Sequence, residues 1–229
     1  MIVVIGPAAL RASPTGVGRA VGTAPEIAAA AAAAGAAVEI VTRIGEDGAG
    51  EELLLALARA RVGHLAVLRD PARPTSLAMD DVEPPDEDAD SVPALLAEAE
   101  AAVGRPPTGS SYEPHAAPVL EPADLALGLR YLRDYRVVVA VEPIADGGAA
   151  VIADAAAFAD AGLVVVAPPG LAAPAAYAAA TLLEAPPDDP DGAFAGLVGR
   201  YAAALDRGTP PAEAFRAATA EGGWEAAGT

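Results

Sequence analysis

The segment "AVEIVTRIGEDGAGEELLLALARARVGHLAVLRD", residues 37–70, decides the class of the fold. It opens with a β-branched run over 37–45 that is typical of a buried strand. Residues 50–61 place apolar side chains at the spacing of one helix face, and 62–70 predicts a second strand. This alternation of strand, helix and strand predicts a parallel sheet covered by helices.

The flanking sequence extends the pattern in both directions. Thr23 is predicted to start a helix that ends at Gly35, with Glu26 three residues later completing a capping box. The preceding residues, 13–22, are rich in glycine and predict a loop. Further elements are predicted as strands at 1–6, 135–143 and 163–170, helices at 147–162, 193–208 and 211–222, and either helix or strand at 175–187.

Composition excludes several classes of partner. The chain has 229 residues, of which 53% are hydrophobic, so it can bury a sizeable core. Its net charge of −18 disfavours nucleic acids and anionic membranes. Cysteine is absent, which excludes disulfides and thiolate chemistry. With no signal-peptide pattern at its start, the sequence predicts a cytoplasmic protein.

Two groups of glycines and acids carry a family resemblance. Gly22, Glu26, Ala28, Gly35 and Gly45 have the spacing of the N-terminal signature of the PfkB (ribokinase-like) carbohydrate kinases. The turn "GEDGAG" (45–50) and the segment "PTSLAM" (74–79) are similar to a conserved turn and to the lid of that family. "DPDGAFAGL" (189–197) resembles its C-terminal signature.

The resemblance implies a fold and a set of roles. The fold is a single ribokinase-like α/β domain over 1–229, with a doubly wound, mostly parallel sheet and a small lid at about 71–92. The resemblance places Asp191 as the general base, and Arg11, Gly22 and Glu26 as substrate-binding residues. ATP and Mg²⁺ are the implied cofactors of an active member, and the lid implies a homodimer.

The chain departs from this family where phosphate would bind. Asp188, Asp189 and Pro190 precede Asp191, and proline has no N–H to donate. Two carboxylates beside a phosphate cost on the order of several kcal/mol each. Arg11 falls near the position of the family's substrate-binding aspartate, and Glu26 replaces its asparagine. The chain is also short for the family, with the missing part between residues 170 and 188.

These departures favour a diverged protein that binds a small polar metabolite of the sugar or nucleoside class, with weak or lost phosphoryl transfer. An active kinase is one alternative, using Asp191 as base and magnesium held by Asp188 or Asp189. A non-catalytic structural or regulatory homodimer is another.

Asp191 and the pair of Arg11 and Glu26 each have two interpretations, whereas Asp47 has one. Asp191 is either a helix N-cap or the general base. Arg11 and Glu26 either pair and close the substrate site or bind a zwitterionic ligand. Asp47, between Gly45 and Gly48, is predicted to be a structural turn residue.

Overall fold

A computed structural model describes residues 1–13, 18–78 and 117–221 of the chain. The described residues before and after the gap at 79–116 belong to one compact unit. None of the helices in these ranges is long and apolar enough to cross a membrane.

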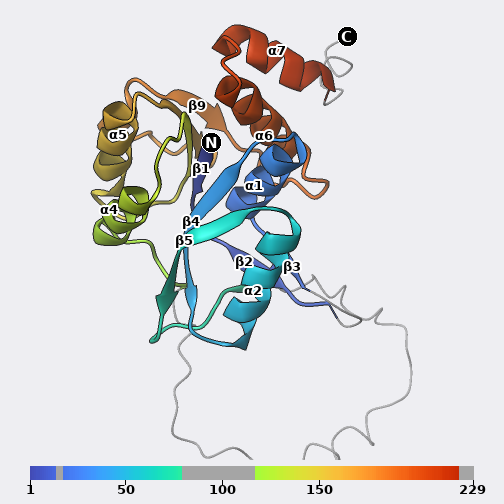
Figure 1. The fold of residues 1–229 in the computed structure, drawn as a ribbon, viewed down its shortest axis with the longest axis vertical. Helices are drawn as coiled ribbons and strands as arrows, with labels where there is room; N and C mark the ends of the chain where they lie inside the picture. The colour runs from blue at the N-terminus through green and yellow to red at the C-terminus, as the bar shows by residue number, and fades with distance from the viewer. Residues whose placement is uncertain (14–17, 79–116, 222–229) are drawn as a thin grey trace, which may run out of the picture. The chain divides into compact units, whose positions relative to one another are not determined.

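The unit is built on a six-stranded parallel sheet in the order β5-β4-β1-β7-β8-β9 (Figure 1). The two central strands are runs of buried β-branched or small residues, as expected for strands covered on both faces. The predicted α/β class and parallel sheet are confirmed. The strands are β1 (Ile2–Ile5), β4 (Val38–Gly45), β5 (Gly63–Asp70), β7 (Val137–Val141), β8 (Gly162–Ala167) and β9 (Thr181–Glu184).

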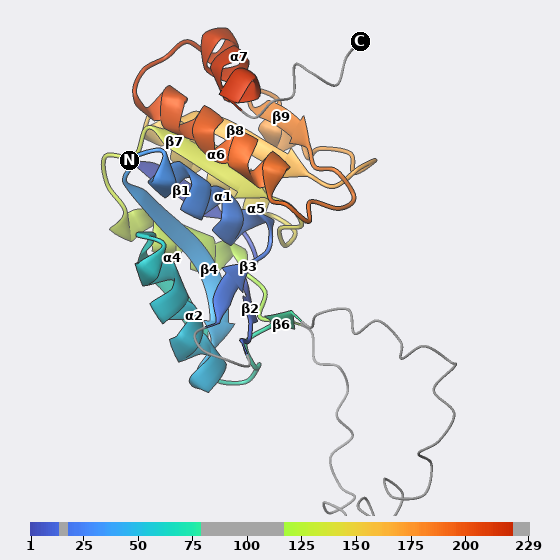
Figure 2. The ribbon, with the colours of Figure 1, turned by 90° about the vertical axis from the view of Figure 1, so that its right-hand side faces the viewer.

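Helices cover both faces of the sheet. On one face, α1 (Thr23–Ala33), α2 (Gly48–Arg59) and α6 (Ala193–Asp206) share a core with β1, β4 and β7. Figure 2 shows α1 and α6 side by side, with α7 (Pro211–Glu221) packed on α6. On the other face lie α4 (Pro122–Tyr131), α5 (Gly148–Phe158) and a 3₁₀ turn at Ala175–Tyr177. The ambiguous segment 175–187 therefore contains this turn followed by strand β9.

The chain order of the strands creates a switch point between β1 and β7. From β1 the chain moves to β4 and β5, then returns to build β7, β8 and β9 on the other side of β1. In open α/β sheets, ligands bind near the carboxyl ends of the strands at such a point. The fold therefore directs attention to the loops after β1 and β7 and to the helices that begin there.

A second, small sheet lies beside the main one and changes the description of residues 13–22. It has the order β3-β2-β6 and consists of β2 (Ala9–Arg11), β3 (Arg19–Val21) and β6 (Leu77–Ala78). The prediction of a loop over 13–22 is wrong at 19–21, which pairs antiparallel with β2. Strand β6 lies in the predicted lid, whose residues 79–92 are outside the described ranges. Pairing of two subunits through the lid stays a prediction.

The start of α1 also differs from the prediction. Gly22 is the N-cap, and no side chain caps the helix there, so the Thr23–Glu26 capping box is wrong. Thr23 is already helical, which moves Glu26 one position too far into the helix to complete the box. Gly22 has φ 107°, a conformation that glycine adopts readily and other residues avoid.

Candidate functional site

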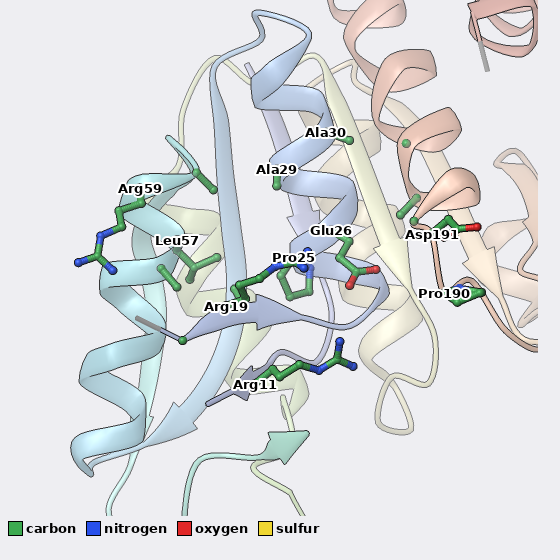
Figure 3. A pocket seen from close by; sticks show the side chains of 17 residues that line it. Arg11, Arg19, Pro25, Glu26, Ala29, Ala30, Leu57, Arg59, Pro190 and Asp191 are labelled. Carbon is green, nitrogen blue, oxygen red and sulfur yellow. The ribbon is translucent and has the colours of Figure 1, made fainter. Parts of the chain in front are cut away.

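The candidate site is a groove of about 720 Å³ over the outer side of α1, between α2 and α6 (Figure 3). This volume is within the range of small-molecule sites. The loop before α6 lies along one side, and β2 and β3 lie at one end. The groove brings together three of the four residues predicted for the site, namely Arg11, Glu26 and Asp191.

Gly22, the fourth predicted residue, is not among those that line the groove. Its position is explained by the backbone. It starts α1 with a positive φ, and a Cβ added there would approach other heavy atoms no closer than 3.9 Å. Conformation rather than lack of space therefore favours glycine at this position.

Charged side chains gather at the end of the groove formed by β2 and β3. Arg11 and Arg19 are direct partners in the antiparallel pair β2–β3, and both line the groove. Glu26 comes from the first turn of α1, and Figure 3 shows both guanidinium groups turned toward it. Burial raises the pKa of Glu26, and Asp189 adds to this, whereas the Gly22 backbone and the two arginines act to lower it. The carboxylate thus faces two cations but is partly withdrawn from water.

The start of α6 is occupied by a side chain of the protein itself. Asp189 accepts hydrogen bonds from the backbone N–H of Phe194 (3.0 Å) and of Ala195 (2.9 Å). Its backbone oxygen accepts a third, from Gly192 N–H (3.0 Å). A helix N-terminus attracts anions because its first amides lack partners inside the helix. At α6 the carboxylate of Asp189 occupies two of these amides.

This arrangement corrects the interpretation of Asp191 as a cap. The N-cap position of α6 is Gly192, in a left-handed conformation, and the capping side chain is that of Asp189. Asp191 is exposed and lines the groove. Figure 3 shows its carboxylate directed away from Glu26 and Arg11.

A smaller cavity of about 210 Å³ lies at the carboxyl ends of β7, β8 and β9. Its walls include Pro168, Pro169, Pro186 and Pro187, which have no N–H to offer a phosphate. They also include Glu142, whose carboxylate accepts a hydrogen bond from Ile144 N–H (2.7 Å). Its volume is below the usual range of small-molecule sites.

Asp47 has a structural role, as its sequence context predicts. It caps α2 by accepting a hydrogen bond from Gly50 N–H (2.7 Å). It also accepts bonds from the N–H (2.8 Å) and the hydroxyl (2.7 Å) of Thr75, tying the segment before β6 to the start of α2. Partial burial opposes ionisation, but these bonds and Arg69 outweigh it and lower the pKa of Asp47.

Two residues of the site were missed from the sequence. The sequence predicts a loop at Arg19, because the three residues "RAV" are too short to give a strand signal of their own. For Asp189 the sequence predicts a charge that repels phosphate, or a magnesium ligand, and not the cap of α6. Within the described ranges no group of three His, Cys, Asp or Glu residues is placed to hold a metal ion.

No protein-family model and no curated protein matches this sequence. Solved structures do match. A PfkB protein from Polaromonas sp. JS666 aligns at 16% identity and a TM-score of 0.60, covering 96% of this chain and 93% of the other. A putative phosphofructokinase from Staphylococcus aureus aligns at 12% identity and a TM-score of 0.58, with coverages of 97% and 90%.

The ribokinase of Arabidopsis thaliana, solved in complex with ribose and ATP, is also similar. It aligns at 15% identity and a TM-score of 0.54, covering 96% of this chain and 90% of the other. Identities this low report on architecture alone. The chain therefore has the α/β fold of the ribokinase-like carbohydrate kinases.

Proposed function

We propose that this protein is a diverged relative of the PfkB carbohydrate kinases that binds a small polar metabolite in the groove over α1. In this proposal, ATP-dependent phosphoryl transfer is lost or weak. The fold supports the relationship, and the mixed polar and apolar lining of the groove supports a small ligand of the sugar or nucleoside class.

One observation carries the loss of phosphoryl transfer, namely the carboxylate of Asp189 at the start of α6. The amides of Phe194 and Ala195 already donate to it. A phosphoryl group placed there would have to displace this carboxylate from the two amides. If the carboxylate stayed in place, its negative charge would repel the phosphoryl group. Removing a single preorganised donor from an oxyanion site costs about 10²–10³ in rate. Occupation of two donors by a fixed anion is at least as severe.

The proposal is tested by two measurements on the same panel. Sugars and nucleosides, together with their acids and phosphates, are screened for a rise in melting temperature, which reports binding to the folded state. Each is then incubated with Mg-ATP, and ADP release is followed. We expect at least one compound to stabilise the protein, with ADP release no higher than the no-substrate blank. Sugar-dependent ADP release at ordinary kinase rates, or a panel without any stabilising compound, would contradict the proposal.

An active kinase with Asp191 as general base is the second candidate. It is favoured by one observation, that Asp191 lines the same groove as Glu26 and Arg11. A base must reach the hydroxyl proton in a plausible substrate pose, and side-chain rotation of an exposed residue permits this. If ADP release is found, Asp191→Asn should abolish it under this candidate. The matched variant Asp188→Asn, at another exposed aspartate of the same loop, should leave it in place.

A further inference from the structure

The end of the groove formed by β2 and β3 contains a pair of like charges that the fold holds together. Arg11 and Arg19 stand directly opposite each other on β2 and β3, so their side chains leave the same face of the small sheet. Like charges at directly opposite positions destabilise an antiparallel pair. The carboxylate of Glu26 already opposes this repulsion, and a ligand oxyanion between the two guanidinium groups would oppose it further.

Two arginines meet one carboxylate at the end of the groove formed by β2 and β3. The whole sequence has a net charge of −18, yet Arg11 and Arg19 both turn their guanidinium groups toward Glu26 here (Figure 3). The guanidinium of Arg59 and the carboxylate of Asp191, which also line the groove, point away from this end. A local positive site on an acidic protein raises the concentration of small anions at that site relative to the surrounding surface.

Arginine is also suited to this task by its shape. The guanidinium group is planar and presents a fork of N–H donors that matches a carboxylate or a phosphate with two parallel hydrogen bonds. Beside the two arginines, the lining is apolar and made of small side chains that leave room for a carbon skeleton. It comprises Ala29 and Ala30 of α1 together with Ala56, Leu57 and Ala60 of α2 and its end.

We infer that the ligand of this groove is a small metabolite that carries an oxyanion, a carboxylate or a phosphate, held by Arg11 and Arg19. The inference rests on the proposed function, because it concerns the ligand of the same groove. It assigns the oxyanion to Arg11 and Arg19 together, because both guanidinium groups turn toward the same point in the groove, the carboxylate of Glu26.

Glu26 has the opposite effect in this arrangement. Its carboxylate faces the two arginines and competes with a ligand anion for them. Glu26 is half-buried, and this burial raises the pKa of its carboxyl group. Replacement of Glu26 by glutamine should therefore strengthen anion binding, whereas replacement of either arginine should weaken it.

The test compares matched neutral and anionic compounds at constant ionic strength. The pairs are glucose with gluconate, glucose with glucose 6-phosphate, and ribose with ribose 5-phosphate, and inorganic phosphate is added as a fourth probe. Dissociation constants are measured by calorimetry for the wild type and for Arg11→Gln, Arg19→Gln and Glu26→Gln. The matched control is Arg133→Gln, because Arg133 is exposed and follows α4 on the other face of the sheet.

We expect the anionic member of at least one pair to bind at least tenfold more tightly than its neutral partner. Arg11→Gln and Arg19→Gln should each weaken it about tenfold or more, as expected for loss of a hydrogen bond to a charged group. Glu26→Gln should tighten it, and Arg133→Gln should not change it. The two anionic classes distinguish a carboxylate ligand from a phosphate ligand, and binding of inorganic phosphate alone shows whether the oxyanion suffices.

Other results would overturn the inference. If neutral sugars bind as tightly as their acids and phosphates, the arginines do not select an anion, although the groove is still a metabolite site. If anions bind equally well to the wild type and to both arginine variants, the anion lies elsewhere. If no compound binds at all, the inference and the proposed function fail together. Unaltered melting of unliganded Arg19→Gln shows that a loss of binding is not a loss of fold.

Discussion

Replacement of Asp189 by alanine tests how the chain fills the start of α6. The carboxylate accepts two backbone hydrogen bonds, from Phe194 N–H and Ala195 N–H, and no other capping side chain is bonded there. Loss of a capping side chain costs about 1 kcal/mol. Loss of a negative charge beside the positive end of the helix dipole costs a further 0.3–1 kcal/mol, roughly. We therefore expect Asp189→Ala to lower the free energy of unfolding by about 1–2 kcal/mol.

The assay is urea unfolding at pH 7 followed by far-UV circular dichroism. For a chain of this size, the expected loss corresponds to a fall in melting temperature of roughly 2–8 °C. The control is Asp191→Ala in the same loop, because Asp191 is exposed and its change should stay within about 0.5 kcal/mol. Hydrogen exchange gives a second reading, since the amides of Phe194 and Ala195 should lose protection only in the Asp189 variant.

Equal stability of the two alanine variants would refute this reasoning, as would fast exchange of both amides in the wild type. Either result would mean that Asp189 does not hold the start of α6 in solution. The amides would then be available to an external anion, and the main argument against phosphate binding would be removed.

Three further predictions concern single substitutions, the first with a matched control in the same helix. Gly199→Ala should lower the free energy of unfolding in urea by about 1–3 kcal/mol, because the new Cβ would lie 2.7 Å from a backbone nitrogen of α1. The control is Gly196→Ala in the same helix, whose new Cβ would approach only the flexible end of Arg200. This control should be neutral or stabilising. Asp47→Asn should lower the free energy of unfolding by about 1 kcal/mol at pH 7. Because the pKa of Asp47 is lowered in the folded state, the difference in stability between wild type and variant should shrink as the pH falls below about 4. A difference in stability that does not depend on pH would contradict this prediction. Glu26→Gln should stabilise the protein, because the pKa of Glu26 is raised in the folded state and its charge therefore opposes folding at neutral pH. The melting temperature of the variant should exceed that of the wild type at pH 7 and approach it below about pH 4. A lower melting temperature of the variant at pH 7 would contradict the raised pKa.

The main sheet was accessible from sequence because its strands are strong local signals. The runs "IVVI" and "VVVAV" are buried over their whole length. Uninterrupted apolar runs of this kind are typical of strands that are covered on both faces of a sheet. Their alternation with helices of ordinary length left a parallel sheet as the simple solution. The short strands of the small sheet gave no such signal. β3 has three residues and one buried side chain, so its pairing with β2 depends on tertiary contacts.

The residues of the site could be predicted only in part from the sequence. Arg11, Glu26 and Asp191 were chosen by resemblance, and the fold brings them to one groove. The sequence could not show that Asp189 rather than Asp191 caps α6, because both residues precede the helix. The left-handed turn at Gly192 decides which carboxylate reaches the amides. Likewise Gly22 was selected as a binding residue, whereas its position is explained by the backbone at the start of α1.

Under the proposed function the amides at the start of α6 are closed to a nucleotide, and titration of the isotope-labelled protein with Mg-ATP tests this most directly. Backbone amide resonances of Gly192 to Gly196 report on this end of the helix without any assumption about turnover. We predict that they stay unchanged up to millimolar Mg-ATP, whatever occurs at Arg11 and Arg19. Saturable shifts of these amides, with Phe194 and Ala195 among the largest, would contradict the account.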